Sequence, residues 1–126
     1  MRVMSVSAVT ITSAQPERLA TFYRERLGVP LESATHGPMQ QHYEGWLGSP
    51  ELGGVHFAVL KGRAGSGDAG GPAPTFRVRG LEACVAELEA AGAPLAHRIA
   101  DLGEGKRVAS FHDPDGNIFR LIDLGF

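Results

Sequence analysis

Imidazole, carboxylate, indole and guanidinium groups occur at alternate positions of several short extended stretches. Because side chains two residues apart share one face of a strand, each stretch presents its groups together. Guanidinium offers paired donors to an anion, indole offers a stacking surface, and imidazole exchanges a proton near neutral pH. The residues expected to bind a ligand are His42, Trp46, His56, Arg77 and Arg120, with His56 and Glu44 as candidate catalytic residues.

Two other interpretations of these residues stay open. His42, Glu44 and His56 form a two-histidine, one-carboxylate set that suits a divalent metal (Zn, Ni, Fe or Mn) if their strands are neighbours. Alternatively, Arg120 pairs with Glu44 or Asp123 and the histidines bond to backbone groups, a structural role only. Convergence of several polar side chains on one cavity favours a ligand site, because apolar residues would fill a structural core at lower cost.

The elements that carry these residues follow the order β-α-β-β-β, and this order occurs twice. Period-two alternation and turn residues predict strands, while an apolar stripe that ends at glycine predicts each helix. The first set comprises a strand at 5–12, a helix at 15–28 and strands at 29–33, 40–48 and 53–61. The second comprises a strand at 75–80, a helix at 81–92 and strands at 93–99, 106–112 and 116–124.

Segments of the first half correspond to segments of the second half at similar steps along the chain. Ile11 matches Phe76 at a step of 65, 27–31 matches 91–95 at a step of 64, and 57–61 matches 119–123 at a step of 62. We therefore expect one domain, 1–126, made of module one (1–61), a Gly- and Ala-rich linker (62–74) and module two (75–126). Two modules that pair can curl their sheets around a cavity, where a ligand would bind.

The stretches QPERLATFYRERLGVPL, LEACVAELEAAGAPL and FHDPDGNIFRLIDL, at 15–31, 81–95 and 111–124, resemble the vicinal oxygen chelate superfamily. This superfamily includes glyoxalase I, extradiol dioxygenases and bleomycin resistance proteins. The resemblance implies an α+β fold of two paired βαβββ modules that form a curled mixed sheet around a cavity. It also implies a homodimer. One scaffold with many activities does not by itself fix the function.

Metal-using relatives place ligands on the first and last strand of each module. In this sequence those positions fall on Ala8, Ala58, near Ala73, and on Arg120. Alanine offers no ligand and arginine repels a cation, so we expect no standard metal centre and no cofactor. The expected function is binding of a small anionic or polar metabolite in the intermodule cavity. The alternatives are a metal-dependent lyase, isomerase or dioxygenase with a relocated His/Glu site, and a non-catalytic drug-binding resistance protein.

Composition narrows the classes of partner. With 12 Lys and Arg against 14 Asp and Glu, the net charge of -2 gives no broad attraction to nucleic acid or to an anionic membrane. The start of the chain lacks the apolar region of a signal peptide, and the single cysteine, Cys84, excludes an intrachain disulfide. A cytoplasmic protein is therefore expected.

DPDG at 113–116 predicts a type I turn, with Asp113 and Asp115 as turn formers.

Overall fold

The computed structural model describes residues 1–2, 4–36, 41–62 and 73–126, and the chain divides into two compact units, 1–65 and 66–126. The first unit contains β1 (Ala8–Ser13), α1 (Pro16–Leu27), β2 (Glu32–Ala34), β3 (His42–Leu47), a short 3-10 helix η1 (Pro50–Leu52) and β4 (Val55–Lys61). The second contains β5 (Thr75–Arg77), α2 (Leu81–Ala90), β6 (Leu95–Gly103), β7 (Lys106–His112) and β8 (Ile118–Asp123). Most of the predicted linker lies outside the described residues.

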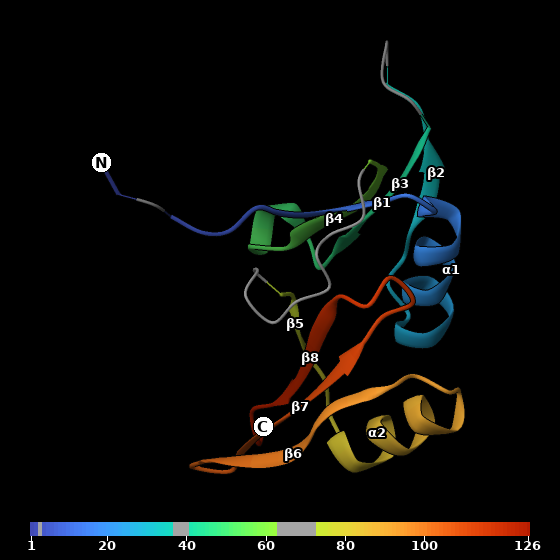
Figure 1. Cartoon of the computed structure of the whole chain (residues 1–126). Helices are drawn as coiled ribbons and strands as arrows, with labels where there is room; N and C mark the ends of the chain where they lie inside the picture. Colours follow the sequence, from blue (N-terminus) through green and yellow to red (C-terminus); the bar gives the residue numbers. More distant parts are fainter. Residues whose placement is uncertain (3, 37–40, 63–72) are drawn as a thin grey trace. The chain divides into compact units, whose positions relative to one another are not determined.

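The first sheet has the strand order β1-β4-β3-β2 (Figure 1). Strand β4 pairs in parallel with β1 and antiparallel with β3, which in turn pairs antiparallel with β2. Helix α1 supplies the crossover that a parallel pair requires, because parallel strands cannot be joined by a tight turn. The sheet is therefore mixed, as the sequence predicted.

Helix α1 covers one face of the first sheet. It begins with Pro16, whose missing N–H is harmless in the first turn, and it ends at Gly28, which adopts a left-handed conformation with φ 72°. Leu19, Ala20 and Tyr23 are fully buried, and the Tyr23 ring lies 5.3 Å from the ring of Phe57 on β4. The side chains of β4 that alternate with Phe57 therefore point to the opposite face.

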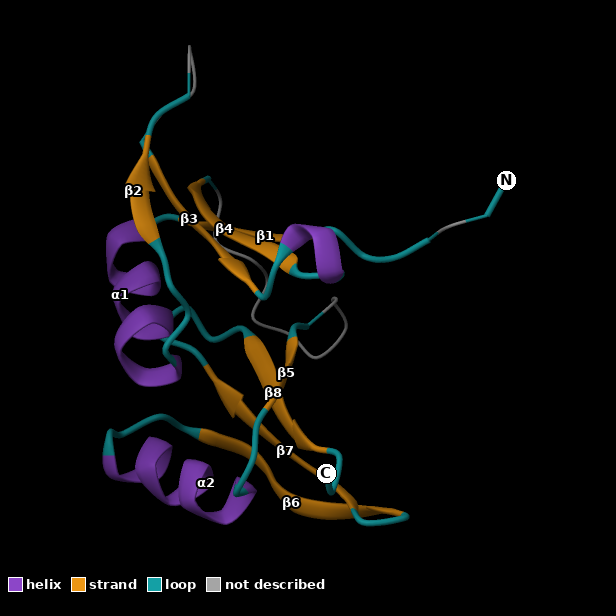
Figure 2. Cartoon of the chain, turned by 180° about the vertical axis from the view of Figure 1, so that it is seen from behind, coloured by secondary structure: helices purple, strands orange, loops and turns teal. Residues whose placement is uncertain are grey.

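The second unit repeats this architecture, with the strand order β5-β8-β7-β6 and α2 beside the sheet (Figure 2). Its core includes Phe111 and Phe119, which are fully buried and stacked with ring centroids 5.9 Å apart. Ile11 pairs with Val59 in the first sheet, and Phe76 pairs with Leu121 in the second. Phe76 lies 65 residues after Ile11, and Leu121 lies 62 residues after Val59, which are the predicted steps. The internal repeat is therefore confirmed.

The boundaries of some strands differ from the prediction. Residues 29–33 were expected to form a strand, but β2 begins only at Glu32. The N–H of Val29 donates to the carbonyl of Tyr23, and the side chains of Val29 and Leu31 are buried. Hydrophobic burial beside the helix therefore takes precedence over local β propensity in this segment.

The turn before β8 has the predicted form. The N–H of Gly116 donates to the carbonyl of Asp113 at 2.9 Å, which closes the turn. One carboxylate oxygen of buried Asp113 also accepts hydrogen bonds from the N–H groups of Asp115 and Asn117, each at 2.9 Å. Asp113 is thus a turn former, as the sequence indicated.

Within the described ranges, no helix is long and apolar enough to cross a membrane.

Arg107 on β7 links the second sheet to the start of α2. Its guanidinium donates to both carboxylate oxygens of Glu82, and this contact lowers the pKa of Glu82 to about 2. Because the folded-state pKa is depressed, the stabilisation is present above about pH 4.5 and is lost as the pH falls towards 2. The Glu82 side chain is 62% exposed, so solvent screens the pair and the effect on stability is small.

Replacing Arg107 with methionine should raise the pKa of Glu82 towards its ordinary value of 4.5. An NMR titration of the Glu82 carboxyl group measures this change directly. Lys106→Met is the matched control, because Lys106 lies next in the chain and faces Glu104 at 3.7 Å. A Glu82 pKa that stays near 2 in the Arg107→Met variant would contradict this assignment.

Candidate functional site

The strand register places the polar residues of the first unit on the sheet face opposite α1. Glu44 lies across from Ala58, and Trp46 lies across from His56. His56 and Ala58 alternate with Phe57, which faces the helix. The sequence predicted that His42, Glu44 and Trp46 share a face but left open which one. The register assigns them to the face of His56, away from α1.

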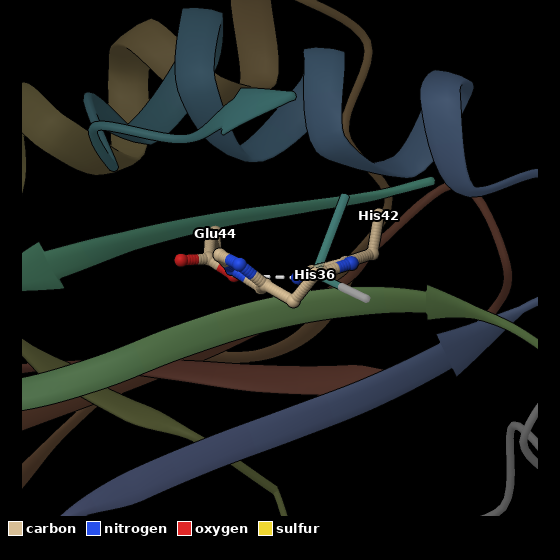
Figure 3. A group of neighbouring side chains, drawn as sticks. All are labelled: His36, His42 and Glu44. Atoms are coloured by element: carbon tan, nitrogen blue, oxygen red, sulfur yellow. Dashed lines mark hydrogen bonds and ion pairs between the residues drawn. The ribbon is translucent and has the colours of Figure 1, made fainter. Parts of the chain in front are cut away.

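Two imidazoles converge on the Glu44 carboxylate of this face. The Nε2 atom of His36 lies 2.8 Å from Oε1 of Glu44, and the Nε2 atom of His42 lies 2.5 Å from the same oxygen (Figure 3). The ligating atoms of the three residues all lie within 4.8 Å of one another. His36, His42 and Glu44, called the His-Glu cluster below, therefore surround one common point.

The His-Glu cluster spans a range of solvent exposure. The His42 side chain is 4% exposed, that of Glu44 is 25% exposed, and that of His36 is 59% exposed. Hydrogen bonds from His42 and His36 lower the pKa of Glu44, and they outweigh the opposing effect of burial. Glu44 is therefore a carboxylate at neutral pH, as both ligand binding and metal binding require.

His56 and Trp46 flank the His-Glu cluster. The Nε2 atom of His56 lies 3.7 Å from the second carboxylate oxygen of Glu44, so this imidazole faces the side of the carboxylate that His36 and His42 leave open. The ring of Trp46 lies 5.2 Å from the ring of His56 in an edge-on arrangement, and Trp46 is 43% exposed. An aromatic surface, an imidazole and a carboxylate thus lie side by side.

The two predicted ligand-binding arginines lie in the second unit. Arg77 on β5 donates to the carbonyl oxygen of Phe126, and its guanidinium lies 4.6 Å from the centre of the Phe126 ring. Arg120 on β8 is paired across the sheet with Thr75 and Ser110. The C-terminal residue thus engages Arg77, while the ligand-binding role of both arginines stays a prediction.

The structural alternative for Arg120 named two carboxylates as its partner. Asp123 instead accepts a hydrogen bond from the N–H of Gly125 and lies 4.0 Å from Arg107. Glu44 is held by His36 and His42. In the described part of the second unit, no carboxylate pairs with Arg120, so a structural ion pair there does not explain why a cation occupies this strand.

Sequence reasoning missed His36. This residue lies just beyond β2, and the antiparallel pairing of β2 with β3 places Ala34 across from His42. The ladder pairs Glu44 with Glu32, so the contact between His36 and the Glu44 carboxylate lies outside the regular strand pairing. A hairpin prediction for 32–47 would have placed His36 near His42 but not at Glu44, because the register pairs Glu44 with Glu32.

The positions at which metal-using relatives hold their ion do not fit a metal in this chain. Ala8 and Ala58 lie on the polar face of the first sheet, across from His56 and Glu44 respectively. Methyl groups cannot ligate a divalent ion, and the guanidinium of Arg120 repels one. The carboxylate on this face belongs to β3 and lies directly across from the position on β4 where relatives carry it.

The duplicated βαβββ topology defines a class of proteins built from two mixed four-stranded sheets, each with one helix. The sequence matches the Glyoxalase/Bleomycin resistance protein/Dioxygenase superfamily over residues 5–121, and the chain belongs to this superfamily. The expected fold is confirmed. No match was found among curated proteins.

Solved structures share the fold at low sequence identity. TnmS3, an antibiotic binding protein from Streptomyces sp. CB03234, is 21% identical with a TM-score of 0.69, over 98% of each chain. UcmS2 is 24% identical with a TM-score of 0.71, over 97% of this chain and 98% of its own. A superfamily member from Sphaerobacter thermophilus DSM 20745 is 21% identical with a TM-score of 0.66, over 96% and 98%. These similarities establish the fold alone.

Proposed function

We propose that this protein binds a small polar or anionic molecule on the polar face of its first sheet, without the superfamily's standard metal centre. The observation that carries the proposal is the exposed Trp46 ring beside His56, whose Nε2 atom lies 3.7 Å from the Glu44 carboxylate. An exposed indole beside two groups that titrate or ionise is a typical ligand-binding arrangement, because the ring stacks and the polar groups orient.

The chemistry of the three groups defines the class of ligand. A planar ring stacks on Trp46, an anionic or carbonyl oxygen accepts a hydrogen bond from His56, and a hydroxyl group donates to Glu44. An aromatic hydroxy acid carries all three features on one small molecule. Hydroxybenzoates are therefore suitable first probes, and polar metabolites without a ring should bind more weakly.

Trp46 is the only tryptophan in the chain, so its fluorescence reports on this face without a label. We expect hydroxybenzoates to change the Trp46 emission in a saturable way and to raise the melting temperature. His56→Ala should weaken binding about 10- to 100-fold, because it removes a hydrogen bond to a charged group. Absence of saturable binding by any hydroxybenzoate would contradict the proposal that the ligand is an aromatic hydroxy acid.

The matched control for His56→Ala is His97→Ala, which changes an exposed histidine on β6 of the second unit. It should leave the affinity unchanged. Equal weakening by both substitutions would contradict a site at Trp46 and His56. Binding with no chemical change of the probe over long incubation supports a binding protein, while turnover supports an enzyme of this superfamily.

A second candidate function is sequestration of an antibiotic. It is favoured by the likeness to TnmS3, an antibiotic binding protein. The same Trp46 fluorescence assay with a panel of aromatic antibiotics separates the two candidates. Micromolar binding of an antibiotic, with hydroxybenzoates inactive, would favour sequestration.

The expected intermodule cavity, the homodimer and the cytoplasmic location stay predictions. Light scattering of the purified protein tests the dimer.

A further inference from the structure

We propose that the His-Glu cluster, His36, His42 and Glu44, is a binding site for one divalent first-row transition metal. This site is distinct from the superfamily's standard metal positions, whose residues in this chain cannot ligate. The proposal does not depend on the ligand proposed above, because metal binding is measured on the protein alone.

The geometry of the cluster is the first argument. Two imidazole Nε2 atoms approach a single carboxylate oxygen, at 2.8 Å and 2.5 Å, from a connection and from a strand (Figure 3). Ligands of one zinc ion at roughly 2.0–2.2 Å lie about 3–3.5 Å from one another. Each imidazole nitrogen therefore needs to move away from the carboxylate oxygen by only about 1 Å or less to admit an ion.

The chemistry of the donors is the second argument. Two neutral imidazoles and one carboxylate form a set that suits Zn, Ni, Co or Fe(II), and it leaves further positions of the ion open to water or a ligand. The set carries a charge of -1 when both imidazoles are neutral, so a divalent ion is attracted to it. The Glu44 oxygen that now accepts the two hydrogen bonds offers the same lone pairs to a metal, and each imidazole ligates through Nε2 once its proton is carried on Nδ1.

The support of the three residues is the third argument. Strand β3 fixes His42 and Glu44 two residues apart on one face, and His42 is nearly fully buried. His56 lies 3.7 Å from the other oxygen of Glu44, where it can orient the carboxylate. His36 is mostly exposed and so can move outward as an ion enters. Two anchored ligands and one adjustable ligand suit a site that loads from solvent.

The test is titration of chelator-treated full-length protein with Zn²⁺ by calorimetry and with Co²⁺ by visible absorption. We expect one equivalent of each metal to bind and the Co²⁺ protein to show ligand-field bands of a low-coordinate site. His36→Ala should weaken binding at least about 10- to 100-fold, and Glu44→Gln should do the same. His36 is exposed, so its substitution should leave the protein folded, with an unchanged melting temperature.

His97→Ala serves as the control, because it removes an exposed histidine far along the chain. It should bind one equivalent with unchanged affinity. Absence of stoichiometric binding in the wild type would overturn the proposal. Binding that survives both His36→Ala and Glu44→Gln would also overturn it, because the metal would then lie elsewhere. We expect the His36→Ala variant to keep its affinity for hydroxybenzoate, measured by Trp46 fluorescence, while it loses affinity for the metal. This result would show that the ligand site and the metal site are independent.

Discussion

Replacing Gly45 with alanine should destabilise the protein by about 3 kcal/mol or more. A Cβ atom at this position of β3 would lie 1.9 Å from the carbonyl oxygen of Pro30 and 2.8 Å from its carbonyl carbon. Both atoms belong to the backbone, and the neighbours Val29 and Leu31 are each only 2% exposed. The Pro30 segment is therefore anchored on both sides and cannot move aside without losing buried contacts.

Urea unfolding of the Gly45→Ala variant measures this loss. Gly62→Ala is the matched control in the same unit, because its new Cβ would meet only the Thr12 side chain, at 3.2 Å. That substitution should change the free energy of unfolding by less than about 1 kcal/mol. If Gly45→Ala is tolerated as well as Gly62→Ala, the close approach of β3 to Pro30 is not a feature of the folded protein.

Truncation of Phe57 or Phe119 to alanine should each cost about 3–5 kcal/mol. These residues occupy equivalent places in the repeat, at a step of 62, and they are 1% and 0% exposed. Phe57 contacts Tyr23 and Phe119 stacks on Phe111, so each ring supports the core of its own unit. The similar cost follows because each substitution leaves a cavity of the same size in a closely packed core.

Phe57→Leu and Phe119→Leu should each lose roughly 1–2 kcal/mol, since most of the apolar volume is kept. Leu52→Ala, at a position that is 89% exposed, should lose less than about 0.5 kcal/mol. Chemical denaturation of the five variants gives the series. A large loss for one phenylalanine and none for its counterpart would show that the two units do not share one core design.

The polar face of the first sheet joins the two functional proposals. Glu44 lies across from Ala58, so the carboxylate stands one strand away from the position that metal-using relatives occupy. A sheet places cross-strand neighbours within about 5.5 Å of each other at the Cβ atoms, so this displacement keeps the acid on the same face. A carboxylate and imidazoles thus lie close to the predicted position of the standard ligand at Ala58.

Much of the fold could be predicted because repeats and periodicity are local properties of the sequence. Alternation along residues 55–61 separates Phe57 from His56, and the pairing of β4 with β1 and β3 confirms that separation. The predicted start of the second strand, at residue 29, was wrong because burial of Val29 and Leu31 beside the helix is a tertiary effect. The extent of β6, which continues to Gly103, also exceeded the predicted range.

By itself, the sequence determined the βαβββ repeat and the superfamily, because both depend on residue types at regular steps along the chain. The replacement of the usual metal ligands stays a prediction. Only the tertiary structure decided which polar residues meet. The side chain of His36, just beyond β2, reaches Glu44 on β3, and the cross-strand register places Trp46 across from His56. Contacts of this kind depend on strand pairing in space, which no local pattern of residues specifies.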